Sequence, residues 1–338
     1  MQESLKQLVD TVLVKSGIAQ KAEIKTISTA LRETSFNLDH PNGDDAAALK
    51  NTNGYDLVAG EGFINEFVRA DPWFAGWCGV MVNISDIAAM GGRPVAVTNT
   101  IWSQPGHELD QIYKGMSDAS RTFDVPIVGG HTNLRCQETH LAVSIYGRAN
   151  TLLSSFTAKP DDVLVAAIDL RGSFRQPFLN WNAATTAPAQ RLREDIALLP
   201  SIAEQGLAHA AKDISQAGLL GTTVMMLESS NVGAHINIDD IAKPNDVSWS
   251  DWLCCFPSFG YLLATSESKL DELLESFKKR DISATCIGNI NNDKQLTVQK
   301  GKQTECFWDL EKQPLTGFTS PNLNNNNLNE VTYARAQF

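Results

Sequence analysis

The segment from residue 71 to residue 94 constrains the fold more than any other part of the chain. Its side chains are apolar on almost every face, which predicts a helix over residues 72–90 that is buried all round. Asp71-Pro72 is a typical helix start, and Gly91-Gly92 is a typical stop. A helix of this kind needs protein on every side, so the sequence predicts a globular chain with a sizeable core.

Two polar residues interrupt this apolar helix. Asn83 and Asp86 are three positions apart and therefore share one helix face. Burying the Asp86 carboxylate without a partner would cost roughly several kcal/mol, so something must pair with it. A hydrogen bond within the core and a bound metal ion both satisfy this need, and the sequence leaves both open.

Three further acids stand in unusual surroundings. Asp44 and Asp45 follow an Asn-Gly turn, where two adjacent carboxylates repel each other unless a cation lies between them. A solvated turn is the alternative. Glu61 ends a predicted strand over residues 56–60 between two glycines, which let a backbone approach a ligand closely.

Two glycine-containing segments add candidate ligand contacts. Gly129, Gly130, His131 and Thr132 follow a predicted strand over 125–128 and can present backbone amides to a phosphate, with an ordinary turn as the alternative. Asp213-Ile214-Ser215 places an acid and a serine before a predicted helix over 218–229 that begins with glycine, where both side chains are candidate site residues. For Ser215 the alternative is a helix cap.

Composition excludes several classes of protein. The net charge is −11 and no basic cluster occurs, so we expect no binding to nucleic acid. No apolar run is long enough for a spanning helix, and the first residues do not resemble a signal peptide, so we expect no membrane association. The six cysteines form no CxxC pair, which favours reduced thiols and a cytoplasmic protein.

A chain of 338 residues fits two domains of ~100–200 residues each. The turn-rich stretch 154–162 marks the boundary, which predicts domains over 1–155 and 156–338 with an Asn-rich tail near 322–329. Helices are expected over 1–25, 72–90, 107–123, 188–210, 218–229 and 266–280. Strands are expected over 56–60, 95–102, 125–128, 139–147, 163–168, 234–238 and 286–290.

The order of these motifs resembles the superfamily of aminoimidazole ribonucleotide (AIR) synthetase, thiamine-monophosphate kinase, selenophosphate synthetase and the hydrogenase-maturation dehydratase. Residues 83–94 look like the N-x-S-D-x-A-A-M-G-x-x-P signature of the thiamine-monophosphate kinases. The resemblance covers nearly the whole chain and is nearest to uncharacterised AIR synthase-related proteins. It implies an α/β (α+β) two-domain fold, in which the N-terminal sheets of two subunits pair into a β-barrel and the C-terminal domain is a mixed α/β sandwich.

The resemblance also implies a site. ATP would lie in a cleft between the domains, and Mg²⁺ would be held by Asp44, Asp45, Glu61 and Asp86. Asn83 would orient the site, and Asp213 would supply an acid from the second domain. The nucleotide phosphates would contact Gly129, Gly130, His131 and Thr132. The expected partners are a small-molecule substrate and a second copy of the chain, through an interface of at least ~2,000 Å².

The second domain departs from the kinase pattern, because Gln216, Ser258 and Phe259 stand where acids are expected. Phe259 and Tyr261 then predict an apolar wall for the acceptor pocket, with a place in the core as the alternative. Three functions follow: a kinase resembling thiamine-monophosphate kinase, an enzyme for ATP-driven dehydration or cyclisation, and a nucleotide-binding partner protein with little turnover.

Overall fold

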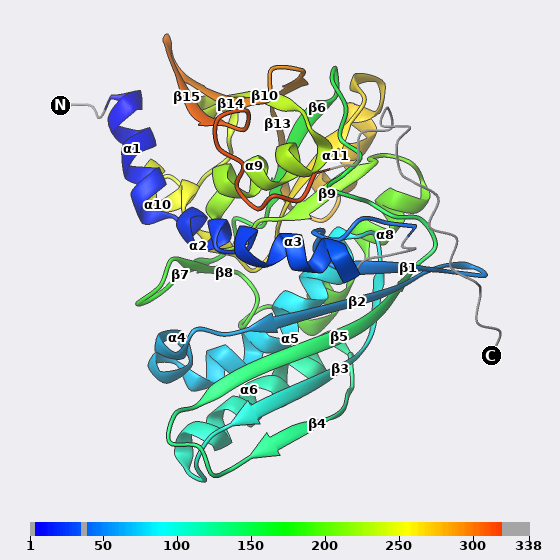
Figure 1. Cartoon of the computed structure of the whole chain (residues 1–338), viewed down its shortest axis with the longest axis vertical. Coiled ribbons are helices and arrows are strands. Elements are labelled where there is room, and N and C mark those ends of the chain that lie inside the picture. Colours follow the sequence, from blue (N-terminus) through cyan, green and yellow to red (C-terminus); the bar gives the residue numbers. More distant parts are fainter. Residues whose placement is uncertain (1–3, 35–38, 320–338) are drawn as a thin grey trace.

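The computed structural model describes residues 4–34 and 39–319, which fold into a mixed α/β structure around two large sheets (Figure 1). The first sheet has the strand order β1-β2-β5-β3-β4. Its strands are β1 (Ala47–Asn51), β2 (Gly54–Gly62), β3 (Arg93–Trp102), β4 (Ile127–Asn133) and β5 (His140–Ala149). All neighbours are antiparallel except β3 and β4, which run parallel and are joined by a helical crossover.

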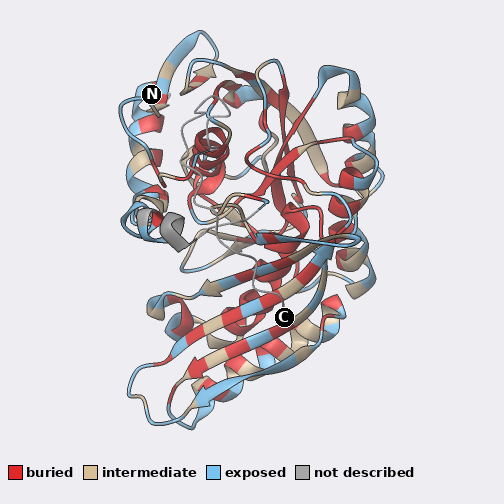
Figure 2. Cartoon of the chain, turned by 45° about the vertical axis from the view of Figure 1, so that its right-hand side comes forward, coloured by how far each residue is buried: buried red, intermediate tan, exposed pale blue. Residues whose placement is uncertain are grey.

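Helices α5 (Pro72–Ala89) and α6 (His107–Phe123) cover one face of this sheet, and the short helix α4 (Asn65–Ala70) precedes them. Strand β5 shows the consequence, because its residues alternate between buried and accessible positions along the strand (Figure 2). On the uncovered face several large apolar side chains remain accessible, and Val128 is 63% exposed.

Helix α5 agrees with its prediction. Every residue from 74 to 89 is buried, and the Asp71 side chain accepts a hydrogen bond from the Phe74 amide at 3.1 Å. Two glycines allow α5 and α6 to pack closely. A Cβ on Gly76 would lie 2.0 Å from the Ile112 carbonyl oxygen, and one on Gly115 would lie 1.9 Å from that of Trp73. The register of the two helices therefore depends on both glycines.

The second large sheet belongs to the second half of the chain and has the order β15-β14-β10-β13-β6-β12-β9. Strands β6 and β12 are buried along their whole length, because helices and loops cover both faces (Figure 2). The strands are β6 (Val163–Ile168), β9 (Ala210–Asp213), β10 (Gly233–Asn237), β12 (Gly260–Thr265), β13 (Ser283–Asn291), β14 (Gln295–Lys300) and β15 (Gln303–Asp309).

The remaining elements surround this sheet. The helices are α7 (Ala189–Ile196), α8 (Leu198–Glu204), α9 (Gly218–Ser230), α10 (Trp249–Leu253) and α11 (Leu270–Lys278), with short 3-10 turns over 238–240 and 267–269. A small sheet joins β7 (Ser173–Arg175), β8 (Asn180–Asn182) and β11 (Phe256–Pro257). In the described part of the chain, no helix is both long and apolar enough to cross a membrane.

The N-terminal helices α1 (Leu5–Lys15), α2 (Ile18–Ala22) and α3 (Lys25–Thr34) come before the first sheet in sequence. The apolar face of α1 nevertheless packs with the core of the second half, where Leu5, Leu8 and Val12 join Leu164 and Ile236. The division of the chain at residues 155 and 156 stays a prediction, and these contacts attach the first helix to the second half.

Two predicted elements need correction. Strand β4 continues through Gly129 and Gly130 to Asn133 instead of ending at residue 128. The helix expected over 188–210 is divided into α7 and α8, and its last residue begins strand β9. The elements that were not predicted are the helices α3, α4 and α10 and the strands β1, β7, β8, β9, β11, β12, β14 and β15. The Asn-rich stretch 322–329 lies outside the described residues.

Candidate functional site

Four carboxylates from four separate segments face a common region between the two sheets. Asp45 lies in the loop before β1, Glu61 on β2, Asp86 on α5 and Asp213 at the end of β9. The charges of Asp45, Glu61 and Asp213 all act on Asp86. The charges of Asp45 and Glu61 also act on Asp213. We call these residues the four-carboxylate cluster. The sequence resemblance named these four acids, together with Asp44, as site residues, and their role stays a prediction.

Asp86 is the member of the cluster with a buried, unpartnered carboxylate oxygen. It is 5% exposed, and its Oδ2 has no hydrogen-bond partner within the described residues. Burial, and then repulsion from Asp213 and Glu61, raises the pKa of Asp86 well above its ordinary value. The alternative of a satisfied core hydrogen bond therefore finds no support at this oxygen. A cation or a proton is needed to neutralise it.

Asn83 lies one helical turn before Asp86. Its Nδ2 donates a hydrogen bond to the Gly79 carbonyl oxygen at 2.8 Å. Its Oδ1 is buried and has no partner among the residues that the structure describes. This helix face thus carries two unpaired oxygens, which are the atoms that a hard cation or a ligand hydroxyl binds.

Asp213 ends strand β9 opposite the other acids. Burial, and then the Asp45 carboxylate, raises the pKa of Asp213 to about 8. Two residues later, the buried Ser215 Oγ also lacks a partner in the described chain. Ser215 does not cap α9, because the residue at the cap position is Ala217, which makes no side-chain cap hydrogen bond. The cap alternative for Ser215 is wrong.

Asp44 has a different environment from its neighbour. Its side chain is fully buried and accepts hydrogen bonds from Ser154 Oγ at 2.8 Å and from the Ser155 amide at 3.1 Å. His40 Nε2 lies 3.2 Å from the same carboxylate. Burial opposes ionisation, but the hydrogen bond from His40 and the charge of Lys212 together hold the pKa of Asp44 below its ordinary value. Asp44 therefore ties its loop to the junction between the two halves.

Asp45 forms a buried ion pair that sequence reasoning missed. Lys212 Nζ contacts Asp45 Oδ1, and the Asp213 amide donates to Asp45 Oδ2 at 3.1 Å. The side chains of Lys212 and Asp45 are 3% and 5% exposed, so the solvated-turn alternative for this acid pair is wrong. Burial disfavours the ammonium group, but attraction to Asp45 and Asp44 outweighs it and raises the pKa of Lys212. A lysine inside an apolar strand was the available signal.

Glu61 is the half-buried member of the cluster. Burial raises its pKa, Lys21 of α2 opposes that effect, and Asp45 adds to it. Lys21 also lowers the pKa of Asp213. A second cation therefore acts on the cluster, from a helix that packs against the second half of the chain.

The donor chemistry fits Mg²⁺, because the cluster offers only oxygen ligands. Within residues 4–34 and 39–319, however, no three acidic, histidine or cysteine side chains are arranged to hold a metal by themselves. Mg²⁺ in nucleotide sites is commonly held by one or two carboxylates together with substrate phosphates. Asp86 with its unpaired oxygen, Glu61 and Asp213 are the residues that would hold it.

The predicted phosphate-binding segment is not brought to the cluster within one chain. Glu61 pairs with Val143, Val143 with Asn99, and Asn99 with Gly130 across successive strands. At ~4.8 Å per strand, Gly130 is about 14 Å from Glu61 along the sheet. Gly129, Gly130, His131 and Thr132 are exposed residues of the edge strand β4 rather than a loop beside the acids.

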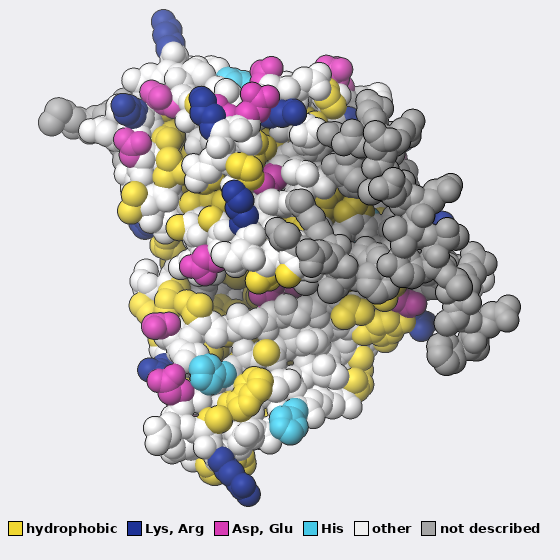
Figure 3. Space-filling view, viewed as in Figure 1, with side chains coloured by type: hydrophobic (Ala, Val, Ile, Leu, Met, Phe, Trp, Pro, Cys, Tyr) yellow, Lys and Arg dark blue, Asp and Glu magenta, His cyan; other side chains and the backbone are white. Residues whose placement is uncertain are grey.

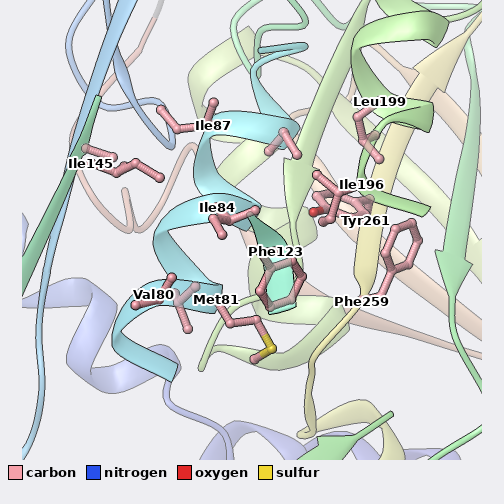
Figure 4. Packing of buried hydrophobic residues seen from close by; sticks show 14 of the residues in the cluster. Val80, Met81, Ile84, Ile87, Phe123, Ile145, Ile196, Leu199, Phe259 and Tyr261 are labelled. Carbon is pink, nitrogen blue, oxygen red and sulfur yellow. The ribbon is translucent and has the colours of Figure 1, made fainter. Parts of the chain in front are cut away.

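The aromatic wall predicted for an acceptor pocket is wrong, and its core alternative is correct. Phe259 is 6% exposed, and it packs edge-on against the fully buried Tyr261 with ring centroids 4.9 Å apart. Both side chains lie in the core with Phe123, Ile196 and other apolar residues (Figure 4). The cavity beside Phe259 measures about 10 Å³, which is room for one water molecule.

The end of the described chain covers the acidic loop. Gly43 has φ = +112°, and a Cβ there would lie 2.4 Å from Phe318, so only glycine fits beneath this ring. The buried Glu228 holds the same segment by accepting hydrogen bonds from the Leu315, Thr316 and Gly317 amides. Glu228 thus fixes the segment that covers the loop carrying Asp44 and Asp45.

The chain is similar in sequence to one family of known proteins. The AIR synthase related protein family matches the chain in its N-terminal domain over residues 43–149 and in its C-terminal domain over residues 176–301. An uncharacterised protein of Synechocystis is 43% identical over 279 residues, which are 82% of this chain and 86% of the relative. An uncharacterised protein of Methanocaldococcus jannaschii is 34% identical and covers 93% of this chain and 99% of its own.

Solved structures share the fold. PurL of T. maritima, complexed with ADP, matches with a TM-score of 0.72 at 18% identity, over 95% of this chain and 54% of that chain. This chain therefore spans about half of that PurL. AaThiL, complexed with AMPPCP and TMP, matches with a TM-score of 0.62 at 17% identity, over 82% of this chain and 94% of that chain.

Proposed function

Because this chain belongs to the AIR synthase related protein family, we propose that it is an ATP- and Mg²⁺-dependent enzyme that phosphorylates or otherwise activates a small molecule. A thiamine-monophosphate kinase of Pyrococcus abyssi is 27% identical to it over 82% of this chain and 92% of its own, and a selenide, water dikinase of Clostridioides difficile is 28% identical over 57% of this chain and 58% of its own. Thiamine monophosphate is the first acceptor to test, and the replacement of the second-domain acids of the kinase pattern favours a different small molecule.

The unpaired oxygen of Asp86 is the observation that carries this proposal. A buried carboxylate oxygen without a donor is costly, and the structure places three further carboxylates near it. A divalent cation removes this cost and, when bound, supplies charge neutralisation to the phosphates. Phosphoryl transfer and ATP-driven dehydration both need such neutralisation and positioning more than covalent catalysis.

The roles of the individual residues follow from their environments. Asp86, Glu61 and Asp213 would hold the ion, while Asn83 Oδ1 would orient a ligand or a coordinated group on the same helix face. Asp44 would keep the loop in place through Ser154 and Ser155.

We also propose that two chains form a dimer through the uncovered face of the first sheet. Hydrophobic side chains and histidines gather there, over the lower half of the molecule in Figure 3. Val58, Val95 and Val128 are exposed on the strands of this sheet. Pairing of two such faces would close the sheets into a barrel and cover the edge strand that carries Gly129, Gly130, His131 and Thr132.

Calorimetry on Asp86→Asn tests the proposed site. We expect Mg²⁺-dependent ATP affinity to fall at least ~10-fold, because a neutral amide replaces a metal-binding carboxylate. Asp118→Asn on the neighbouring helix α6 is the control, since Asp118 pairs with Lys114 and Arg121 away from the cluster. Unchanged Mg-ATP affinity in a folded Asp86→Asn protein would contradict the metal role.

Product analysis then separates the two reactions. A stable phosphorylated product indicates a kinase, whereas ADP, free phosphate and a dehydrated product indicate a synthetase. Tight ATP binding without ADP formation across a panel of small molecules would instead indicate a nucleotide-binding partner protein.

A further inference from the structure

Lys212 occupies an unusual position for a lysine. It lies on the buried strand β9 between Ala211 and Asp213, and its side chain is only 3% exposed. Its ammonium group contacts Asp45 Oδ1, while the Asp213 amide donates to Asp45 Oδ2. Both oxygens of this carboxylate are therefore already engaged by the second half of the chain.

The other members of the four-carboxylate cluster are free by comparison. The side chains of Glu61, Asp86 and Asp213 make no hydrogen bond to the described part of the chain, and Asp86 Oδ2 is buried without a partner. The cluster is thus divided into one carboxylate that pairs with a lysine and three that pair with no described side chain.

We propose that Lys212 is a built-in cation that takes the place of one divalent ion at Asp45, so that Asp45 is not a metal ligand in the working site. This inference rests on the proposed function, since it concerns how the same site binds Mg-nucleotide. The nucleotide complex would then contain one metal ion fewer than it would if Asp45 were also a metal ligand. The positive charge of the missing ion is supplied by a side chain that is always present.

The geometry favours this role over a salt bridge that stabilises the fold alone. Lys212 also acts electrostatically on Asp44, Glu61, Asp86 and Asp213, so its charge is felt by every acid around the site. A fixed ammonium has no coordination shell to complete, and it cannot be removed by a chelator. It therefore offsets negative charge at one end of the cluster without competing with phosphate for ligands.

Native mass spectrometry with Mn²⁺ and the non-hydrolysable analogue AMPPCP tests the inference by counting the ions in each nucleotide-bound chain. Lys212→Gln releases the Asp45 carboxylate, and we expect its complex to carry one more Mn²⁺ than the wild-type complex. Lys21→Gln is the matched control, because it removes a nearby charge that lies within hydrogen-bond distance of no carboxylate among residues 4–34 and 39–319. We expect no change in the count for this variant.

The double variant Asp45→Asn/Lys212→Gln keeps the test decisive if the single variant does not fold, because it replaces the ion pair with two neutral amides. We expect its count to equal that of the wild type. One ion fewer in the double variant, or equal counts in wild type and Lys212→Gln, would overturn the inference while leaving nucleotide binding established. Failure of the wild type to bind AMPPCP with Mn²⁺ would instead overturn the proposed function, and the inference with it.

Discussion

Replacing Asp213 with asparagine should make the stability of the ligand-free protein less sensitive to pH. Burial and the Asp45 carboxylate raise the pKa of Asp213 to about 8, against about 3.9 in an unfolded chain. Between these values the folded chain holds a proton that the unfolded chain has released. The stability that this proton contributes is complete below the unfolded pKa and is lost as the pH rises toward the folded pKa.

The size of the effect follows from linkage. Each pH unit in this window changes the free energy of unfolding by about 1.36 kcal/mol, so the wild type loses about 2.7 kcal/mol through Asp213 between pH 5 and pH 7. Unfolding 338 residues has an entropy of about 0.7 kcal/mol per kelvin, which converts this loss into about 4 °C of Tm.

Differential scanning calorimetry in EDTA at pH 5, 6 and 7 measures this directly. The Tm of Asp213→Asn minus that of the wild type should rise by about 4 °C from pH 5 to pH 7. For Asp10→Asn, on the exposed face of α1, the same difference should stay constant. A difference for Asp213→Asn that is equal at pH 5 and pH 7 would refute the placement of Asp213 among buried carboxylates.

Two further predictions concern the core and the assembly. Phe259→Ala should lower the free energy of unfolding by about 3–5 kcal/mol in chemical denaturation and leave the Mg-ATP affinity of the folded protein unchanged, and a loss below about 1 kcal/mol would contradict its core position. In light scattering, the wild type should have twice the 36.9 kDa chain mass and Val128→Asp should shift toward one chain, whereas a wild-type monomer at micromolar concentration would contradict the dimer.

Local patterns were sufficient for the elements whose burial is uniform or strictly periodic. Helix α5 was predicted with its start at Pro72, because an all-round apolar segment has only one way to avoid water. The same pattern placed Asn83 and Asp86 on one face. The prediction that strand β4 ends before Gly129 was wrong. Glycines often end strands, and β4 continues through Gly129 and Gly130 only because it pairs with β3. The single helix predicted over 188–210 was wrong for a similar reason, because its last residue belongs to strand β9, which forms by pairing with β12.

The sequence by itself determined which acids and which glycines the chain carries and on which local faces they lie. It also determined the family, through the order of these motifs along the chain. The tertiary structure alone decided which charges meet. Lys212 and Asp45 are 167 positions apart, and no local pattern links them. Their attraction becomes strong only when folding removes both from water, since the same two charges exposed to solvent would interact weakly.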